Sequence, residues 1–232
     1  MRSDRYSRKR RYRVRPRFYV FTAVFVSLIF LAAFLILQAV LPKDHGVHVG
    51  APAFKTEQGL SYEQGLRVML AAKKYINTPG LTYDASYFVD GYPPKKIGVC
   101  TDVIWNGLAA VGVDFKSLVD SDIDRHFDRY SAVISVKDPN IDFRYVPVLR
   151  TYLDAHAIRL TTDPSNLLAW QPGDIVIFQD EHTAMVSCLR NLLGYPYVIQ
   201  HGKDPAGDED RLYNDSGLVL TGHYRWPQTI TF

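Results

Sequence analysis

The stretch PGDIVIFQDEHTAMVSCLRNLLGYPYVIQH, residues 172–201, decides the fold. It opens on the turn signal Pro172-Gly173-Asp174, which leads into the β-rich run Ile175–Phe178. Residues 182–189 then alternate as a strand, and Tyr197–His201 has the composition of another. We expect the last two runs to pair as an antiparallel hairpin around a short connection.

Helical patterns come before this stretch, and one more strand comes after it. Ser61-x-x-Gln64 has the form of a capping box. A polar loop is expected over 202–217 and a last strand over 218–226. Helical spacing is found at 61–75, 101–111, 115–127 and 147–155. Helices followed by strands predict an α+β domain over residues 58–232, with N-terminal helices packed on a C-terminal antiparallel sheet.

The charges of the 232-residue chain are segregated. Residues 1–17 carry nine Lys and Arg and one acid, residues 18–41 carry no charge, and the remainder carries 18 basic and 23 acidic residues. A basic cluster can bind nucleic acid through phosphates, or it can fix the orientation of a neighbouring membrane span. The segment that follows the cluster distinguishes these readings.

Residues 18–41 read FYVFTAVFVSLIFLAAFLILQAVL, and as a helix they would be about 36 Å long, enough for a hydrocarbon core of about 30 Å. The run is longer than a signal-peptide core and ends without a small-x-small cleavage site. We therefore expect a retained, single-pass signal anchor in the inner (cytoplasmic) membrane and no nucleic-acid partner. Residues 1–17 would be a cytoplasmic tail, residues 42–57 a stalk, and the folded domain would lie in the periplasm or outside.

Cys100 stands in Gly98-Val99-Cys100-Thr101-Asp102, immediately before a predicted helix. A helix N-terminus lowers the pKa of a thiol, and its free N–H groups can hold an oxyanion. A structural cysteine is the alternative reading of this position.

A nucleophilic cysteine needs a base, usually a histidine that a third polar group holds in place. His182 opens one predicted strand and His201 ends the next, so the hairpin would bring them to the same end. We expect His182 to be the base, with His201 or Gln200 orienting its ring.

Only two cysteines occur, and a disulfide between Cys100 and Cys188 is the expectation for an oxidising compartment. His182 and Cys188 lie six residues apart on one strand, about 20 Å at 3.3 Å per residue. A disulfide needs Cα atoms within about 7 Å, so Cys100 cannot both bond Cys188 and meet His182. We favour catalysis and expect Cys188 to be a buried free cysteine.

Zinc held by His182, His201 and His223 is a rival arrangement, but no HExxH or CxxC spacing supports it. The sequence predicts neither a metal nor a cofactor. It gives no indication of oligomeric state.

The blocks Gly98-Val99-Cys100-Thr101-Asp102-Val103, Pro172-Gly173-Asp174-Ile175-Val176 and Thr221-Gly222-His223-Tyr224-Arg225 follow one another in an order that resembles the bacterial family called domain of unknown function 1287. That family is similar to the NlpC-type papain-like cell-wall peptidases. The resemblance implies a papain-like fold with Cys100 as nucleophile, His182 as base and His201 as orienting residue.

The expected function is hydrolysis of an amide bond, with peptidoglycan stem peptides as the substrate class outside the cytoplasm. We expect four further side chains to contact the substrate: Asp102, Gln200, His223 and Arg225. The rival is a non-catalytic envelope module that binds wall fragments or a partner protein.

Overall fold

The computed structural model describes residues 59–214 and 217–228. The expected tail, span and stalk, residues 1–57, lie outside this part of the chain. Among helices within the described ranges, none has the length and hydropathy that crossing a bilayer requires.

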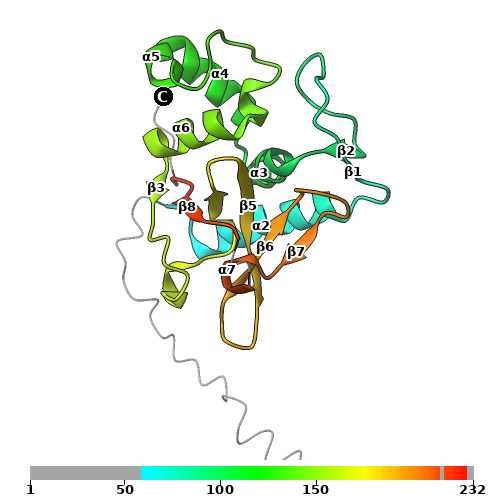
Figure 1. The fold of residues 1–232 in the computed structure, drawn as a ribbon, viewed down its shortest axis with the longest axis vertical. Helices are drawn as coiled ribbons and strands as arrows, with labels where there is room; N and C mark the ends of the chain where they lie inside the picture. Colours follow the sequence, from blue (N-terminus) through cyan, green and yellow to red (C-terminus); the bar gives the residue numbers. More distant parts are fainter. Residues whose placement is uncertain (1–58, 215–216, 229–232) are drawn as a thin grey trace, which may run out of the picture. The chain divides into compact units, whose positions relative to one another are not determined.

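A six-stranded antiparallel sheet has the strand order β3-β8-β4-β5-β6-β7. The strands are β3 (Ile158–Arg159), β4 (Ile175–Phe178), β5 (His182–Arg190), β6 (Pro196–Gln200), β7 (Gly207–Glu209) and β8 (Leu220–Arg225). The predicted hairpin is present as β5 and β6, with Met185 opposite Ile199 and Val186 opposite Val198. Figure 1 shows this hairpin projecting from the folded part at the end away from α4 and α5.

The helices come mostly before the sheet, so the α+β class expected from the sequence is confirmed. They are α2 (Tyr62–Ile76), α3 (Cys100–Ala109), α4 (Phe115–Arg125), α5 (Phe127–Tyr130), α6 (Val146–His156) and α7 (Arg211–Asn214), with 3-10 turns η1 (Asp142–Arg144) and η2 (Leu167–Ala169). The capping box forms as predicted, since the Ser61 hydroxyl accepts the Gln64 N–H at 3.2 Å and the Gln64 side chain accepts the Ser61 N–H at 2.9 Å.

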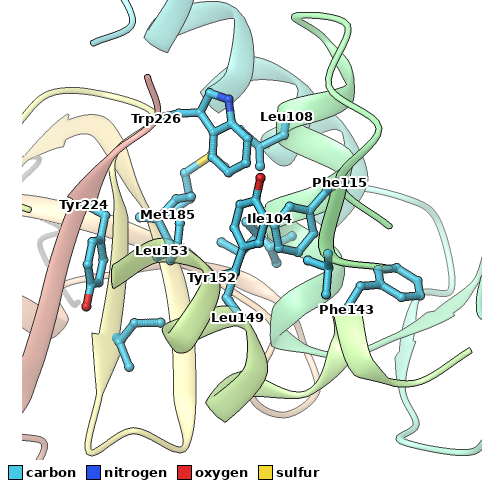
Figure 2. Close-up of a cluster of buried hydrophobic side chains, with 14 of the residues drawn as sticks. Ile104, Leu108, Phe115, Phe143, Leu149, Tyr152, Leu153, Met185, Tyr224 and Trp226 are labelled. Atoms are coloured by element: carbon cyan, nitrogen blue, oxygen red, sulfur yellow. The ribbon is translucent and has the colours of Figure 1, made fainter. Parts of the chain in front are cut away.

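One face of the sheet packs against α2, α3 and α6 and forms the main core. Ile104, Phe115, Leu149, Met185 and Trp226 belong to it, and Figure 2 shows their side chains converging between the helices and the strands. The opposite face carries a smaller apolar cluster: Trp170, Val176, Phe178, Ala184, Val186, Val198 and Leu212. The two clusters define two faces on which a polar side chain of β5 or β6 can lie.

Several predicted boundaries differ from the structure. The helix expected over 115–127 is interrupted at His126, where α5 begins separately. The polar loop expected over 202–217 contains the short strand β7 and the helix α7. Cys188 is exposed rather than buried, because the register of β5 shifts between Val186 and Arg190.

Candidate active site

Cys100 is the first residue of α3 and follows the two-residue strand β2 (Ile97–Gly98), which pairs in parallel with β1 (Thr82–Tyr83). A Cβ atom on Gly98 would lie 2.0 Å from the Tyr75 hydroxyl, so only glycine fits beside this helix start. Both cysteines are free, and the Cys100 side chain is almost fully buried. The helix N-terminus that the sequence predicts for Cys100 is confirmed.

The start of β5 contacts this cysteine through its backbone. The backbone N–H of Thr183 lies close enough to the Cys100 sulfur to lower the pKa of the thiol. Burial raises the pKa of the Cys100 thiol, and the N–H groups of Thr183 and Thr101 offset part of that rise. The nucleophile candidate and the residue directly after His182 are therefore neighbours.

The His182 ring lies on the smaller-cluster face of the sheet. Its Nε2 is 2.7 Å from Gln200 Oε1, and the ring stacks on Phe178. A Cβ atom on Gly202 would approach the ring to 2.9 Å. Burial lowers the pKa of His182, and the Gln200 hydrogen bond opposes that shift.

The Nδ1 atom of His182 has no hydrogen-bond partner within residues 59–214 and 217–228. In the same ranges no hydrogen bond joins the Cys100 sulfur to a histidine nitrogen. The Nε2 atom of His182 is therefore bonded to Gln200, its Nδ1 atom is available, and its ring is not hydrogen-bonded to the Cys100 sulfur.

His201 lies on the other face of β6, the face that packs on α2. Its Nδ1 is 3.3 Å from the Tyr75 hydroxyl, and its Nε2 is 3.4 Å from Asp204 Oδ1. Its ring meets the edge of Tyr83, with the two centroids 5.5 Å apart. The structure therefore sets Gln200, and not His201, beside His182, so His201 does not hold the role of orienting residue here.

Asp102 is fully buried and engaged by neighbours from its own helix and from η1. Arg144 donates to both carboxylate oxygens, each at 2.9 Å, and the Val99 N–H donates to Oδ2 at 2.7 Å. Trp105 donates to Oδ1 at 2.7 Å. Both Asp102 oxygens accept from donors inside the protein and neither is exposed, and the expected substrate contact of Asp102 stays a prediction.

His223 and Arg225 also form their hydrogen bonds with groups inside the protein. His223 is fully buried and stacked on Trp170, with Nδ1 2.7 Å from the Thr161 carbonyl oxygen and Nε2 3.1 Å from Asp174 Oδ2. Arg225 donates to both oxygens of Asp174 at 2.8 Å. Both side chains bind the buried Asp174 carboxylate, and their expected substrate contacts stay predictions.

His182, His201 and His223 each have different partners. Across the described ranges, no three His, Cys, Asp or Glu side chains gather in a way that could hold a metal ion.

Arg144, Tyr75 and Tyr83 were not singled out by the sequence. Arg144 could have been inferred, because a carboxylate in the first turn of a buried helix requires a counter-ion. Tyr75 and Tyr83 come from α2 and β1, and no local pattern links them to Cys100. Burial raises the pKa of both hydroxyl groups, and Asp102 raises the pKa of Tyr75 further.

The fold and site define an α+β domain with a free cysteine at a helix start and a histidine, bonded to Gln200, at the start of the neighbouring strand β5. The family described as "Domain of unknown function (DUF1287)" matches residues 69–226, and the chain belongs to this family. The uncharacterized protein YijF of Escherichia coli (strain K12) is 35% identical over 156 residues, 63% of this chain and 74% of YijF. No solved structure matches the chain significantly.

Proposed function

We propose that this chain is a cysteine hydrolase of the papain-like class, in which Cys100 attacks an amide, His182 moves the proton and Gln200 orients the imidazole. The proposal rests on one observation. Gln200 holds Nε2 of His182 and leaves Nδ1 available, while the N–H of the next residue, Thr183, is near enough to the Cys100 sulfur to lower the pKa of the thiol. The nucleophile thus adjoins the strand residue directly after the base, while the base and its orienting amide are bonded to each other on the opposite face of the sheet.

The reaction follows from these roles. The sulfur attacks the substrate carbonyl carbon as its proton passes to Nδ1 of His182, and the Cys100 N–H at the start of α3 stabilises the oxyanion. The C–N bond then breaks, and the amine leaves with the proton from the imidazolium. Water attacks the thioester with His182 as base, which releases the acid and restores the thiol.

The pKa shifts of the two groups describe the resting site. Burial raises the pKa of Cys100 and lowers the pKa of His182, so at neutral pH the thiol and the imidazole are both uncharged. The proton therefore moves during attack rather than before it. For this step the His182 ring must move from its place beside Gln200 and Phe178 to the sulfur, since catalytic groups can reach their working geometry only when substrate binds.

The location and the substrate class come from the N-terminal sequence. The apolar run 18–41 after a basic tail supports a single-pass anchor with the domain outside the cytoplasm. Peptidoglycan stem peptides are the amide substrates that this location would offer. No cofactor is required by the proposed steps.

The test is digestion of purified peptidoglycan by the full chain in detergent, with mass spectrometry of the released fragments. Cys100→Ala should abolish release, and Cys188→Ala should leave it unchanged because Cys188 is the exposed second cysteine. Equal release by wild type and Cys100→Ala would exclude the proposal.

A non-catalytic envelope module that binds wall fragments is the second candidate. The observation that favours it is the separation of the His182 ring from the Cys100 face, together with a raised thiol pKa. In this case the full chain would sediment with peptidoglycan without releasing fragments, and Cys100→Ala would sediment equally well.

A further inference from the structure

An exposed apolar surface surrounds the tip of the β5–β6 hairpin. Leu192 is fully exposed, Leu193 is 57% exposed and Leu168 is 77% exposed. Leu189 and Tyr213 add to it with about half of each side chain exposed. We call these five residues the hairpin patch. Large exposed apolar groups in one place mark a surface that meets a partner or a membrane.

Contacts within the folded part hold the patch together. A Cβ atom on Gly194 would lie 3.0 Å from Leu167 Cδ1, so the hairpin tip packs on η2, which carries Leu168. Arg190 donates to the Trp170 carbonyl oxygen at 2.7 Å and fixes the hairpin to the same segment. The rings of Tyr195 and Tyr213 meet at 4.9 Å and bring α7 to the hairpin.

The described chain starts beside the end of β8, where Gly59 pairs with Pro227 and the Leu60 N–H donates to the Trp226 carbonyl oxygen at 2.9 Å. Leu60 lies next to the first described residue, and its carbonyl oxygen accepts a hydrogen bond from the Gln171 side chain at 3.1 Å. Gln171 is two residues after η2, the segment against which the hairpin tip packs. The described chain therefore begins at the end of β8 and is linked to the hairpin patch only through the segment that follows η2.

We propose that the hairpin patch rests in the membrane interface, with the Leu192 and Leu193 side chains inserted among the lipids. The inference relies on the proposed anchor but not on catalysis. Residues 42–58 are long enough to let the domain reach the bilayer, since an extended chain spans about 3.3 Å per residue. Leucines at the tip and tyrosines at its base match the apolar and interfacial zones of a bilayer.

The test places a fluorophore on the patch of the full chain in phosphatidylethanolamine–phosphatidylglycerol nanodiscs. Leu192→Cys, in a Cys100→Ser, Cys188→Ser background, is labelled with a nitrobenzoxadiazole dye. The matched control is Val136→Cys in the same background. Val136 is 73% exposed, and the next residue, Lys137, is ion-paired with Asp120 and Asp124 of α4. Figure 1 shows α4 at the end of the domain away from the hairpin. Lipids with a nitroxide on the upper acyl chain quench dyes that enter the interface.

The proposal predicts at least threefold stronger quenching at position 192 than at position 136, and loss of that difference when Leu193 and Leu168 are also changed to Ser. Equal quenching at both positions would overturn it. Disulfide-linked dimers of the unlabelled Leu192→Cys chain would also overturn it, because a second copy would then cover the patch. A chain that does not co-elute with nanodiscs would refute the anchor and this inference together, without bearing on peptidoglycan digestion.

Discussion

Two histidines on the same sheet, His182 and His223, have contrasting surroundings. His223 has both nitrogens engaged, by the Thr161 carbonyl and by Asp174, and its ring is covered by Trp170. In His182, Nε2 is bonded to Gln200 and Nδ1 has no partner in the described part of the chain, and the side chain is partly exposed. A histidine whose donors and acceptors are all satisfied inside the protein stabilises the fold. A histidine held at one nitrogen is available for proton transfer at the other.

Replacing His182 should have the largest effect, and that effect is on turnover. His182→Ala should lower kcat by roughly 10²–10⁴-fold, because the proton acceptor is removed. His182 is partly exposed, so the melting temperature should change little. Steady-state digestion of peptidoglycan and a thermal melt measure the two quantities. Unchanged kcat in a folded His182→Ala chain would remove His182 from the mechanism.

The opposite pattern is expected at the buried cluster. Asp174→Asn leaves Arg225 and His223 without their carboxylate, and breaking a buried pair costs about 3–5 kcal/mol. The melting temperature should fall by roughly 10 °C. Turnover measured well below the melting temperature should stay close to that of wild type. A large loss of turnover in the folded variant would mean that this cluster touches the substrate after all.

The orienting amide should have a smaller effect than the base. Gln200→Ala frees Nε2 of His182 and should lower kcat by about tenfold, with KM nearly constant, since the ring is positioned less well. His201→Ala serves as the matched control on the opposite face of β6, and it is expected to affect stability more than kcat. If His201→Ala lowers kcat further than Gln200→Ala in folded protein, the roles of the two residues are reversed.

The pH dependence gives the smallest and most diagnostic effect. Because burial lowers the pKa of His182 and raises that of Cys100, the neutral pair exists between the two values. The plateau of kcat/KM should start below about pH 6.5 and continue past about pH 8.5, the ordinary values of the free groups. A decline of kcat/KM beginning near pH 7.5 would argue for a preformed thiolate–imidazolium pair instead.

Local signals explain why much of the fold was predictable. The capping box at Ser61 and the turn before Ile175 each depend on a few neighbouring residues, so α2 and β4 are found with nearly the right ends. The break at His126 and the strand β7 depend on tertiary packing, and no local pattern announces them.

The choice between Gln200 and His201 was also open to prediction. Side chains alternate along a strand, and a hairpin register that pairs Val186 with Val198 puts His182 on the same face as even-numbered residues of β6. A register shifted by two residues gives the same result. Proximity at one end of the hairpin favours His201, whereas alternation along the strand selects Gln200, the residue that is bonded to His182 in the structure. The ion pair between Asp102 and Arg144 could not be derived in this way, because the two residues are 42 positions apart in the chain.

The most direct test of the central claim is to trap the acyl-enzyme. The full chain is mixed with a synthetic stem peptide, quenched in acid after milliseconds to seconds, and analysed by intact-mass and peptide mass spectrometry. The account predicts an acyl adduct on the Cys100 peptide that forms before product, is absent from Cys100→Ala and forms at least 100-fold more slowly in His182→Ala. Product release without an adduct at Cys100, or an adduct on Cys188, would contradict it.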